Sequence, residues 1–128
     1  MDISLLLVHD DPSVMRGVRM RLEVEGGFVV LGDLRREEAV AAIPLRPAAD
    51  VIVLDADVPG RNLPDLATIR ALASGHPVVV LTLADSDAAA VAAIEAGAAA
   101  VVRKHDPSTL IAAIRWAATP AEGGGPMT

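Results

Sequence analysis

Cysteine is absent from this chain of 128 residues, and lysine occurs once, at Lys104, against ten arginines. Without cysteine, the chain forms neither a disulfide framework nor a thiolate metal site. This composition is compatible with a reducing compartment, and we expect the protein in the cytoplasm. The single lysine also marks one position whose role is easy to follow along the chain.

The chain has no excess of positive charge, since its formal net charge is -6 at pH 7. A nucleic-acid backbone requires a clustered basic face, so we expect any DNA contact to be made by another domain. The N-terminal stretch MDISLLLVHDD contains only a short apolar run that ends in charged residues. It is typical of neither a signal peptide nor a membrane span, and we expect no membrane association.

Five short apolar runs predict strands that are covered on both faces, because each is continuous and too short to form a helix. They are ISLLLV (3–8), FVVL (28–31), VIVL (51–54), VVVL (78–81) and AVV (100–102). The segments between them carry helical spacing, as shown by Val14, Val18 and Leu22; Leu66, Ile69 and Leu72; Val91 and Ile94; and Leu110, Ala113, Ile114 and Ala117. This alternation predicts an α/β fold, a doubly wound five-stranded parallel sheet with helices on both faces.

Capping residues support these boundaries. Asp11-Pro12 predicts the start of the first helix, and Asp106-Pro107 or Pro107-Ser108 that of the last. Gly26-Gly27, Gly75 and Gly97 stand where the first, third and fourth helices should end. The second helix is the least defined, since Arg35 to Ile43 is followed by Pro44 and Pro47. We expect one domain over residues 1–118 and a flexible linker or tail over 119–128, TPAEGGGPMT.

Polar residues follow the predicted strands, where ligands bind in sheets of this kind. These residues are His9-Asp10-Asp11, Asp33, Asp55 and Asp57, Thr82, and Arg103-Lys104. If the strands concerned are neighbours, two carboxylates, a hydroxyl and a lysine converge. Carboxylate oxygens suit Mg²⁺, a carboxylate can itself accept a phosphoryl group, and the lysine and hydroxyl would hold phosphoryl oxygens.

Four segments, in order and at matching spacings, resemble the receiver domain of two-component response regulators over about residues 3–118. They are VHDDPSV, VIVLDADVPG, VVVLT and EAGAAAVVRKHDPSTLIAAI. The resemblance implies a flavodoxin-like receiver fold with strand order 2-1-3-4-5. It also implies a protein that is not an enzyme, apart from its own phosphorylation and dephosphorylation. The ending RKHDPSTLIAAIR is most similar to the NarL/LuxR-type subgroup, whose receivers precede a DNA-binding helix-turn-helix.

The same resemblance implies a role for each residue. Asp55 is the expected phosphoacceptor, with a sensor histidine kinase as the phosphodonor. Asp10 and Asp55 would bind Mg²⁺ through their side chains and Asp57 through its backbone carbonyl. Thr82 and Lys104 would contact the phosphoryl group. Phosphorylation would switch the chain to a homodimer and control transcription through an output domain that is not in this chain.

Three positions depart from the family pattern. His9 stands where an acidic residue is expected, so we expect weaker Mg²⁺ binding and leave open whether His9 is a ligand or a solvated side chain. Val101 replaces the aromatic residue that usually changes rotamer on phosphorylation. Leu63 and Pro64 follow the expected Pro59-Gly60 turn, where a glycine is more usual, and predict a stiffer or displaced loop.

Other interpretations stay open from sequence alone. Asp10 and Asp11 could be helix caps, Asp55 and Asp57 solvated carboxylates, and Lys104 a surface lysine. The Asp-x-Asp ending of a strand also occurs in haloacid dehalogenase-type phosphatases. In that family the second acidic pair follows the Asp-x-Asp motif along the chain, whereas here the acidic pair precedes it. A receiver fold that works as an interaction module without phosphorylation is the main alternative, which His9 and Val101 would permit.

Overall fold

The computed structural model describes residues 2–42, 49–58, 60–61 and 63–119. Five parallel strands form one sheet in the order β2-β1-β3-β4-β5. The strands are β1 (Ile3–Val8), β2 (Phe28–Leu34), β3 (Val51–Asp55), β4 (Val78–Thr82) and β5 (Ala100–Arg103). The predicted α/β class and strand order are therefore confirmed, and all five apolar runs form strands.

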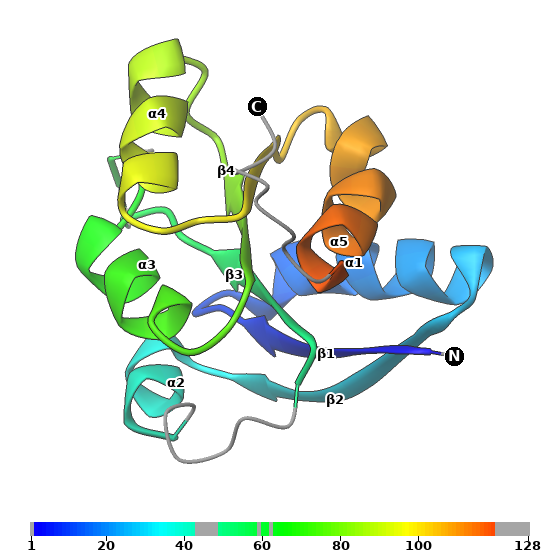
Figure 1. Cartoon of the computed structure of the whole chain (residues 1–128). Helices are drawn as coiled ribbons and strands as arrows, with labels where there is room; N and C mark the ends of the chain where they lie inside the picture. Colours follow the sequence, from blue (N-terminus) through cyan, green and yellow to red (C-terminus); the bar gives the residue numbers. More distant parts are fainter. Residues whose placement is uncertain (1, 43–48, 59, 62, 120–128) are drawn as a thin grey trace.

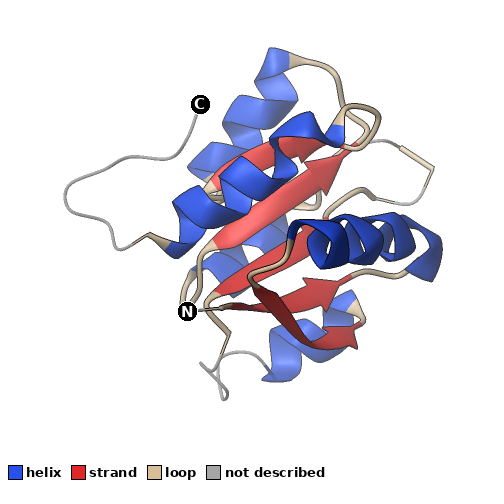
Figure 2. Ribbon diagram, turned by 90° about the vertical axis from the view of Figure 1, so that its right-hand side faces the viewer, coloured by secondary structure: helices blue, strands red, loops and turns tan. Residues whose placement is uncertain are grey.

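Helices cover both faces of the sheet (Figures 1 and 2). One face packs against α1 (Pro12–Glu25) and α5 (Leu110–Ala118), and the other against α2 (Arg36–Ala42), α3 (Leu66–Ala73) and α4 (Asp87–Glu95). Successive strand side chains point to opposite faces, so Val51 and Val53 join the α1/α5 core while Ile52 and Leu54 join the other. In the described part of the chain, no helix is long and apolar enough to cross a membrane.

Side-chain caps begin the helices, as the sequence predicts for Asp11. Asp11, Asp65 and Ser86 accept backbone N–H bonds at the starts of α1, α3 and α4. Asp106 likewise accepts from the backbone N–H of Ser108 and begins a 3-10 turn, η2 (Pro107–Thr109), that continues into α5. The second helix is short, and Pro44 and Pro47 lie outside the described residues, as do residues 120–128 of the expected tail.

Two of the burial predictions were wrong. Strand β2 was expected to be covered on both faces, but it lies at the sheet edge, and Val29 and Leu31 are exposed. Val91 was expected on the buried stripe of α4, yet it is 54% exposed. The buried side of α4 is formed by Ala89 and Ala93 instead, and Ala93 packs in the core with Val78 and Val80 of β4.

The register brings the carboxyl ends of the inner strands level with one another. Val8 of β1 pairs with Leu54 of β3, Asp55 with Leu81 of β4, and Thr82 with Arg103 of β5. Residues that directly follow these pairs therefore meet at one edge of the sheet. Two further backbone bonds extend the alignment there, from Ala56 N to Leu81 O at 3.2 Å and from Lys104 N to Thr82 O at 2.9 Å.

Gly97, which follows α4, has no room for a side chain. Its φ is +117°, and an added Cβ would lie 2.8 Å from the Ala73 Cβ. We expect Gly97→Ala to lower the free energy of unfolding by about 2 kcal/mol in urea denaturation.

The matched control is Gly17→Ala on the exposed side of α1, where an added Cβ meets nothing within 4 Å. This substitution should raise the unfolding free energy by about 0.5–1 kcal/mol, since alanine is the better helix former. Equal effects of the two variants would contradict the steric account of Gly97.

Candidate functional site

The ammonium group of Lys104 lies between two carboxylates at the edge of the sheet. Its Nζ is 2.6 Å from Asp55 Oδ1 and 2.8 Å from Asp57 Oδ2. All three side chains are largely buried, with 14%, 11% and 10% of the Lys104, Asp55 and Asp57 side chains exposed. Lys104 directly follows β5 and Asp55 ends β3, so β4 lies between the strands that they extend. Lys104 is thus a site residue and not an isolated surface lysine.

The Asp57 carboxylate is the most heavily bonded acidic group at this edge. Its Oδ2 accepts from Lys104 Nζ and, at 2.9 Å, from the backbone N–H of Leu83. Its Oδ1 accepts from the Thr82 hydroxyl at 2.5 Å. Thr82 itself is 1% exposed, and its hydroxyl also accepts from Ala84 N. Three donors from the ends of β4 and β5 therefore converge on one carboxylate.

These contacts govern the protonation of the pair. Burial alone would raise the pKa of Asp57, but hydrogen bonds from Lys104, Thr82 and Leu83 outweigh it and hold that pKa below its usual value. Burial would lower the pKa of Lys104, but its bonds to Asp55 and Asp57 raise it above the usual value. At neutral pH, Asp57 is therefore an anion and Lys104 a cation.

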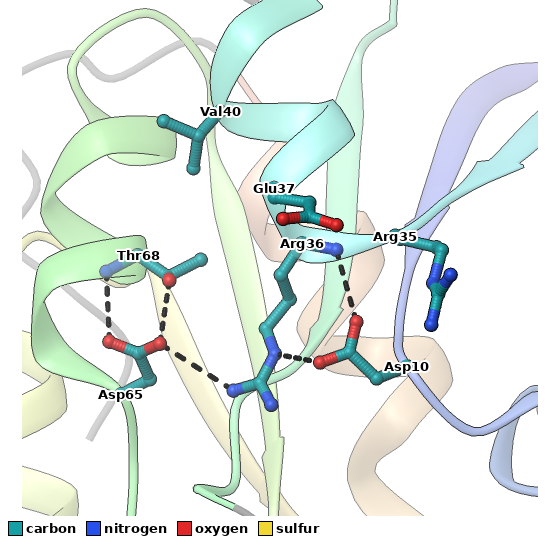
Figure 3. Close-up of a pocket in the computed structure, with 7 residues that line it drawn as sticks. All are labelled: Asp10, Arg35, Arg36, Glu37, Val40, Asp65 and Thr68. Carbon is teal, nitrogen blue, oxygen red and sulfur yellow. Dashed lines mark hydrogen bonds and ion pairs between the residues drawn. The ribbon is translucent and has the colours of Figure 1, made fainter.

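The Asp10 carboxylate is bonded to Arg36 at the start of α2 (Figure 3). Its carboxylate accepts from Arg36 Nε at 2.8 Å and from the Arg36 backbone N–H at 3.3 Å. The guanidinium continues to Asp65, the cap of α3, with Nη1 at 3.6 Å from Asp65 Oδ2. Burial would raise the pKa of Asp10, but the contacts with Arg36 bring it below its usual value. Arg36 thus bridges Asp10, which follows β1, and Asp65 at the start of α3.

The acidic residues line one open hollow of about 530 Å³. Asp10, Asp55 and Asp57 border it together with Lys104 and Arg36. The donor set fits Mg²⁺, which usually takes one or two carboxylates and completes its coordination with water and phosphate oxygens. Asp10 and Asp55 would hold the ion through their side chains, and Asp57 through its backbone carbonyl.

In the arrangement seen here, the carboxylates are bonded to cationic side chains. Among the residues that the structure describes, no three acidic or histidine side chains gather as a metal site. Lys104 neutralises Asp55, and Arg36 neutralises Asp10. A metal ion that enters would have to draw Asp10 from Arg36.

His9 lies beside the site but points to the outer strand. Its Nε2 is 3.0 Å from Asp33 Oδ1, and Asp33 also accepts from Arg19. His9 is not among the residues that line the hollow. The structure therefore places this predicted metal neighbour with Asp33 of β2, away from Asp55.

The loop after Asp57 has the turn that the sequence predicts. Gly60 has φ +78°, and Arg61 N donates to Val58 O at 3.1 Å, while Pro59 lies outside the described residues. The chain then returns to Asp57, because a bridge pairs Asp57 with Pro64 and Val58 N donates to Leu63 O at 2.7 Å. These bonds fix the backbone of Asp57 beside the hollow.

Two features of the site were missed from sequence. The Asp57 side chain was assigned no contact, yet it takes the bonds of Lys104 and Thr82. Arg36 was not considered, although it faces Asp10 and lines the hollow. The position of Asp57 two residues after a strand-end aspartate was the only available signal for the first, and no motif marks the second.

The arrangement can hold an anion and present a nucleophile. Asp55 offers a carboxylate whose contacts from Lys104 and Asp57 N, within the described residues, both use Oδ1. Lys104 and Leu83 line the same hollow, and both, like Thr82, donate to the Asp57 carboxylate beside it. A phosphoryl group on Asp55 would find cationic and hydrogen-bonding partners there.

Comparison with known proteins identifies the family. The sequence matches the response regulator receiver domain model over residues 5–115. It is 32% identical over 114 residues to the nitrate/nitrite response regulator protein NarP of Escherichia coli, covering 88% of this chain and 53% of NarP. The DNA-binding response regulator MtrA of Mycolicibacterium smegmatis is 35% identical over 114 residues, covering 87% and 48% of the two chains.

Among solved structures, a LuxR-family two-component response regulator from Aurantimonas sp. SI85-9A1 superposes with a TM-score of 0.79 at 26% identity. The match covers 99% of this chain and 90% of that one. The chain spans about half the length of the curated relatives that it matches. The family match begins within β1, ends within α5 and includes all the described residues of the hollow, so the chain belongs to the response regulator receiver domain family.

Proposed function

We propose that this receiver accepts a phosphoryl group on Asp55 from the phosphohistidine of a sensor histidine kinase. The observation that carries the proposal is the contact of Lys104 with Asp55 inside a hollow that Asp10 also lines. A carboxylate that is largely buried, faces an ammonium group and opens onto a polar hollow is suited to accept a phosphoryl group.

In the reaction, an Asp55 carboxylate oxygen attacks the phosphorus atom and forms an acyl phosphate. The bond between phosphorus and the donor imidazole nitrogen breaks, and its electron pair stays on that nitrogen, which takes a proton from water. Lys104 would hold one phosphoryl oxygen and Thr82 another. Mg²⁺ bound by Asp10, Asp55 and the Asp57 carbonyl would offset the negative charge that gathers on the phosphoryl oxygens.

The aspartyl-phosphate would act by shifting an equilibrium between two arrangements of the loop and helix that follow β4. Thr82 ends β4 and Leu83 begins that loop, and both donate to Asp57 beside the proposed acceptor. In the whole protein, which we propose works in the cytoplasm, the shift would promote a homodimer. The dimer would bring together DNA-binding output domains. The relative MtrA of Mycolicibacterium smegmatis is a DNA-binding response regulator.

The first test is direct detection of the modified residue. Incubation with Mg²⁺ and phosphoramidate, a small phosphodonor, should add the mass of one phosphoryl group to the intact protein. Asp55→Asn should abolish the adduct, because an amide oxygen is a poor nucleophile. Asp11→Asn is the matched control, since Asp11 lines the same hollow but caps α1, a role that asparagine also fills. An adduct that persists in Asp55→Asn, or none in the native chain, would refute the assignment.

The second test concerns access of the metal to Asp10. Because Arg36 occupies the Asp10 carboxylate, Arg36→Gln should tighten Mg²⁺ binding by about threefold to tenfold, measured by titration of backbone amide resonances. Arg19→Gln is the charge-matched control, since Arg19 pairs with Asp33 outside the hollow and should leave the affinity nearly unchanged. Equal tightening in the two variants would mean that overall charge, and not release of Asp10, sets the affinity.

A further inference from the structure

The ends of β4 and β5 form an anion site with an occupant of its own. An ammonium group, a hydroxyl and a backbone N–H from Lys104, Thr82 and Leu83 all donate to the Asp57 carboxylate, at 2.8, 2.5 and 2.9 Å. The donors come from two different strand ends, while the acceptor comes from a third. A carboxylate with all its strong partners supplied by other elements is bound in the same way as an external anion would be.

The Asp57 carboxylate also lies beside the proposed acceptor. Lys104 contacts Asp55 and Asp57 with the same Nζ atom, and Asp57 N lies 3.4 Å from Asp55 Oδ1. A phosphoryl group attached to Asp55 would need the donors that Asp57 holds. Among the described residues that line the hollow, only Lys104 and Arg36 are cationic, and Arg36 is engaged by Asp10 and Asp65. One set of donors therefore serves two anions, the Asp57 carboxylate and a phosphoryl group on Asp55.

We propose that the Asp57 carboxylate is an internal competitor for the phosphoryl group. It fills the anion site of the resting protein, and Asp55 can keep a phosphoryl group only after Asp57 has given up Lys104 and Thr82. The inference rests on the proposed function and specifies how that same site is regulated. No covalent bond changes in this step, since one anion replaces another on the same three donors.

The competition also involves the loop between β4 and α4. Asp57 bonds the Thr82 hydroxyl and the Leu83 N–H, the first groups of the loop that leads into α4. The far side of that loop is held by Arg103, whose Nη2 donates to Asp85 O at 2.9 Å. The loop that would respond to phosphorylation is therefore already bound to an anion in the resting chain. Displacement of Asp57 would replace one bound anion by a larger and more highly charged one.

The anion site can be tested without any phosphorylation. Asp55→Asn removes the acceptor charge, and the double variant Asp55→Asn/Asp57→Asn also removes the internal anion. Inorganic phosphate is titrated into each without Mg²⁺, and the amide resonances of Thr82, Leu83 and Lys104 are followed. If Asp57 holds the site for nine-tenths of the time or more, the double variant should bind phosphate at least about tenfold more tightly than Asp55→Asn.

Asp55→Asn/Asp11→Asn is the charge-matched control, because it removes a carboxylate of the same hollow that has no contact with the three donors. Tighter phosphate binding in Asp55→Asn/Asp57→Asn but not in Asp55→Asn/Asp11→Asn supports the proposal. Equally tighter phosphate binding in both double variants, or no change in either, overturns it. Asp55→Asn/Asp57→Ala provides a second variant in which no side-chain amide remains to bond Thr82, and it should bind phosphate as the Asp57→Asn pair does.

A kinetic arm separates this inference from the proposed function. In the otherwise native chain with Mg²⁺ and phosphoramidate, Asp57→Asn should form the Asp55 adduct at least about tenfold faster, while Asp11→Asn should not. An unchanged or slower rate in Asp57→Asn overturns the competition. If no adduct forms in any variant, the proposed function fails, and the phosphate titration still decides whether Asp57 occupies an anion site.

Discussion

One ammonium group between two largely buried carboxylates is the interaction on which the site depends. Asp55 and Asp57 lie two residues apart at the end of one strand, and Lys104 is the cation that contacts both. Without it, two negative charges would face each other in a poorly solvated place, which is costly. The chain has this single lysine, so its position after β5 fixes where the two anions can be tolerated.

The fold supplies the geometry that this interaction requires. Strand order β2-β1-β3-β4-β5 places β4 between the strands that carry Asp55 and Lys104, and Thr82 at the end of β4 lies between them. Burial of every residue in β3 and β4 holds those strand ends in fixed register. The edge of the sheet is thus a rigid frame on which side-chain charges are arranged. Two internal ion pairs, Arg36 with Asp10 and Lys104 with Asp57, engage the side chains that the proposed metal ion and phosphoryl group would use.

Much of this frame was predictable from sequence, because strands and helices leave recognisable patterns of apolar and capping residues. Continuous apolar runs located the strands, and capping residues such as Asp11 located helix starts. The ends of the strands bring Asp10, Asp55 and Lys104 to one hollow, and Thr82 joins them through Asp57, as expected for a doubly wound sheet. Residue-level burial was harder to predict, because an edge strand and an alanine-faced helix leave Val29, Leu31 and Val91 exposed.

The side-chain pairing in the site was not predictable in the same way. Which carboxylate meets which cation depends on rotamers and on loop paths, and neither leaves a periodic signal in the sequence. The Asp57 side chain turns toward Thr82 and Lys104 because its backbone is fixed by the loop that returns through Pro64. Arg36 reaches Asp10 because α2 begins directly beyond the end of β2. The assignment of phosphorylation to Asp55 and of metal binding to Asp10, Asp55 and Asp57 stays a proposal.

The most direct measurement of the central interaction is a double-mutant cycle between Lys104→Met and Asp57→Asn, read as the free energy of unfolding in urea. Removal of Lys104 alone leaves two adjacent, largely buried carboxylates without their shared cation, so the account predicts a large loss of stability that Asp57→Asn partly restores. The coupling energy should be about 1–3 kcal/mol. Additive effects of the two substitutions would show that Lys104 does not hold the pair together, and would contradict the account.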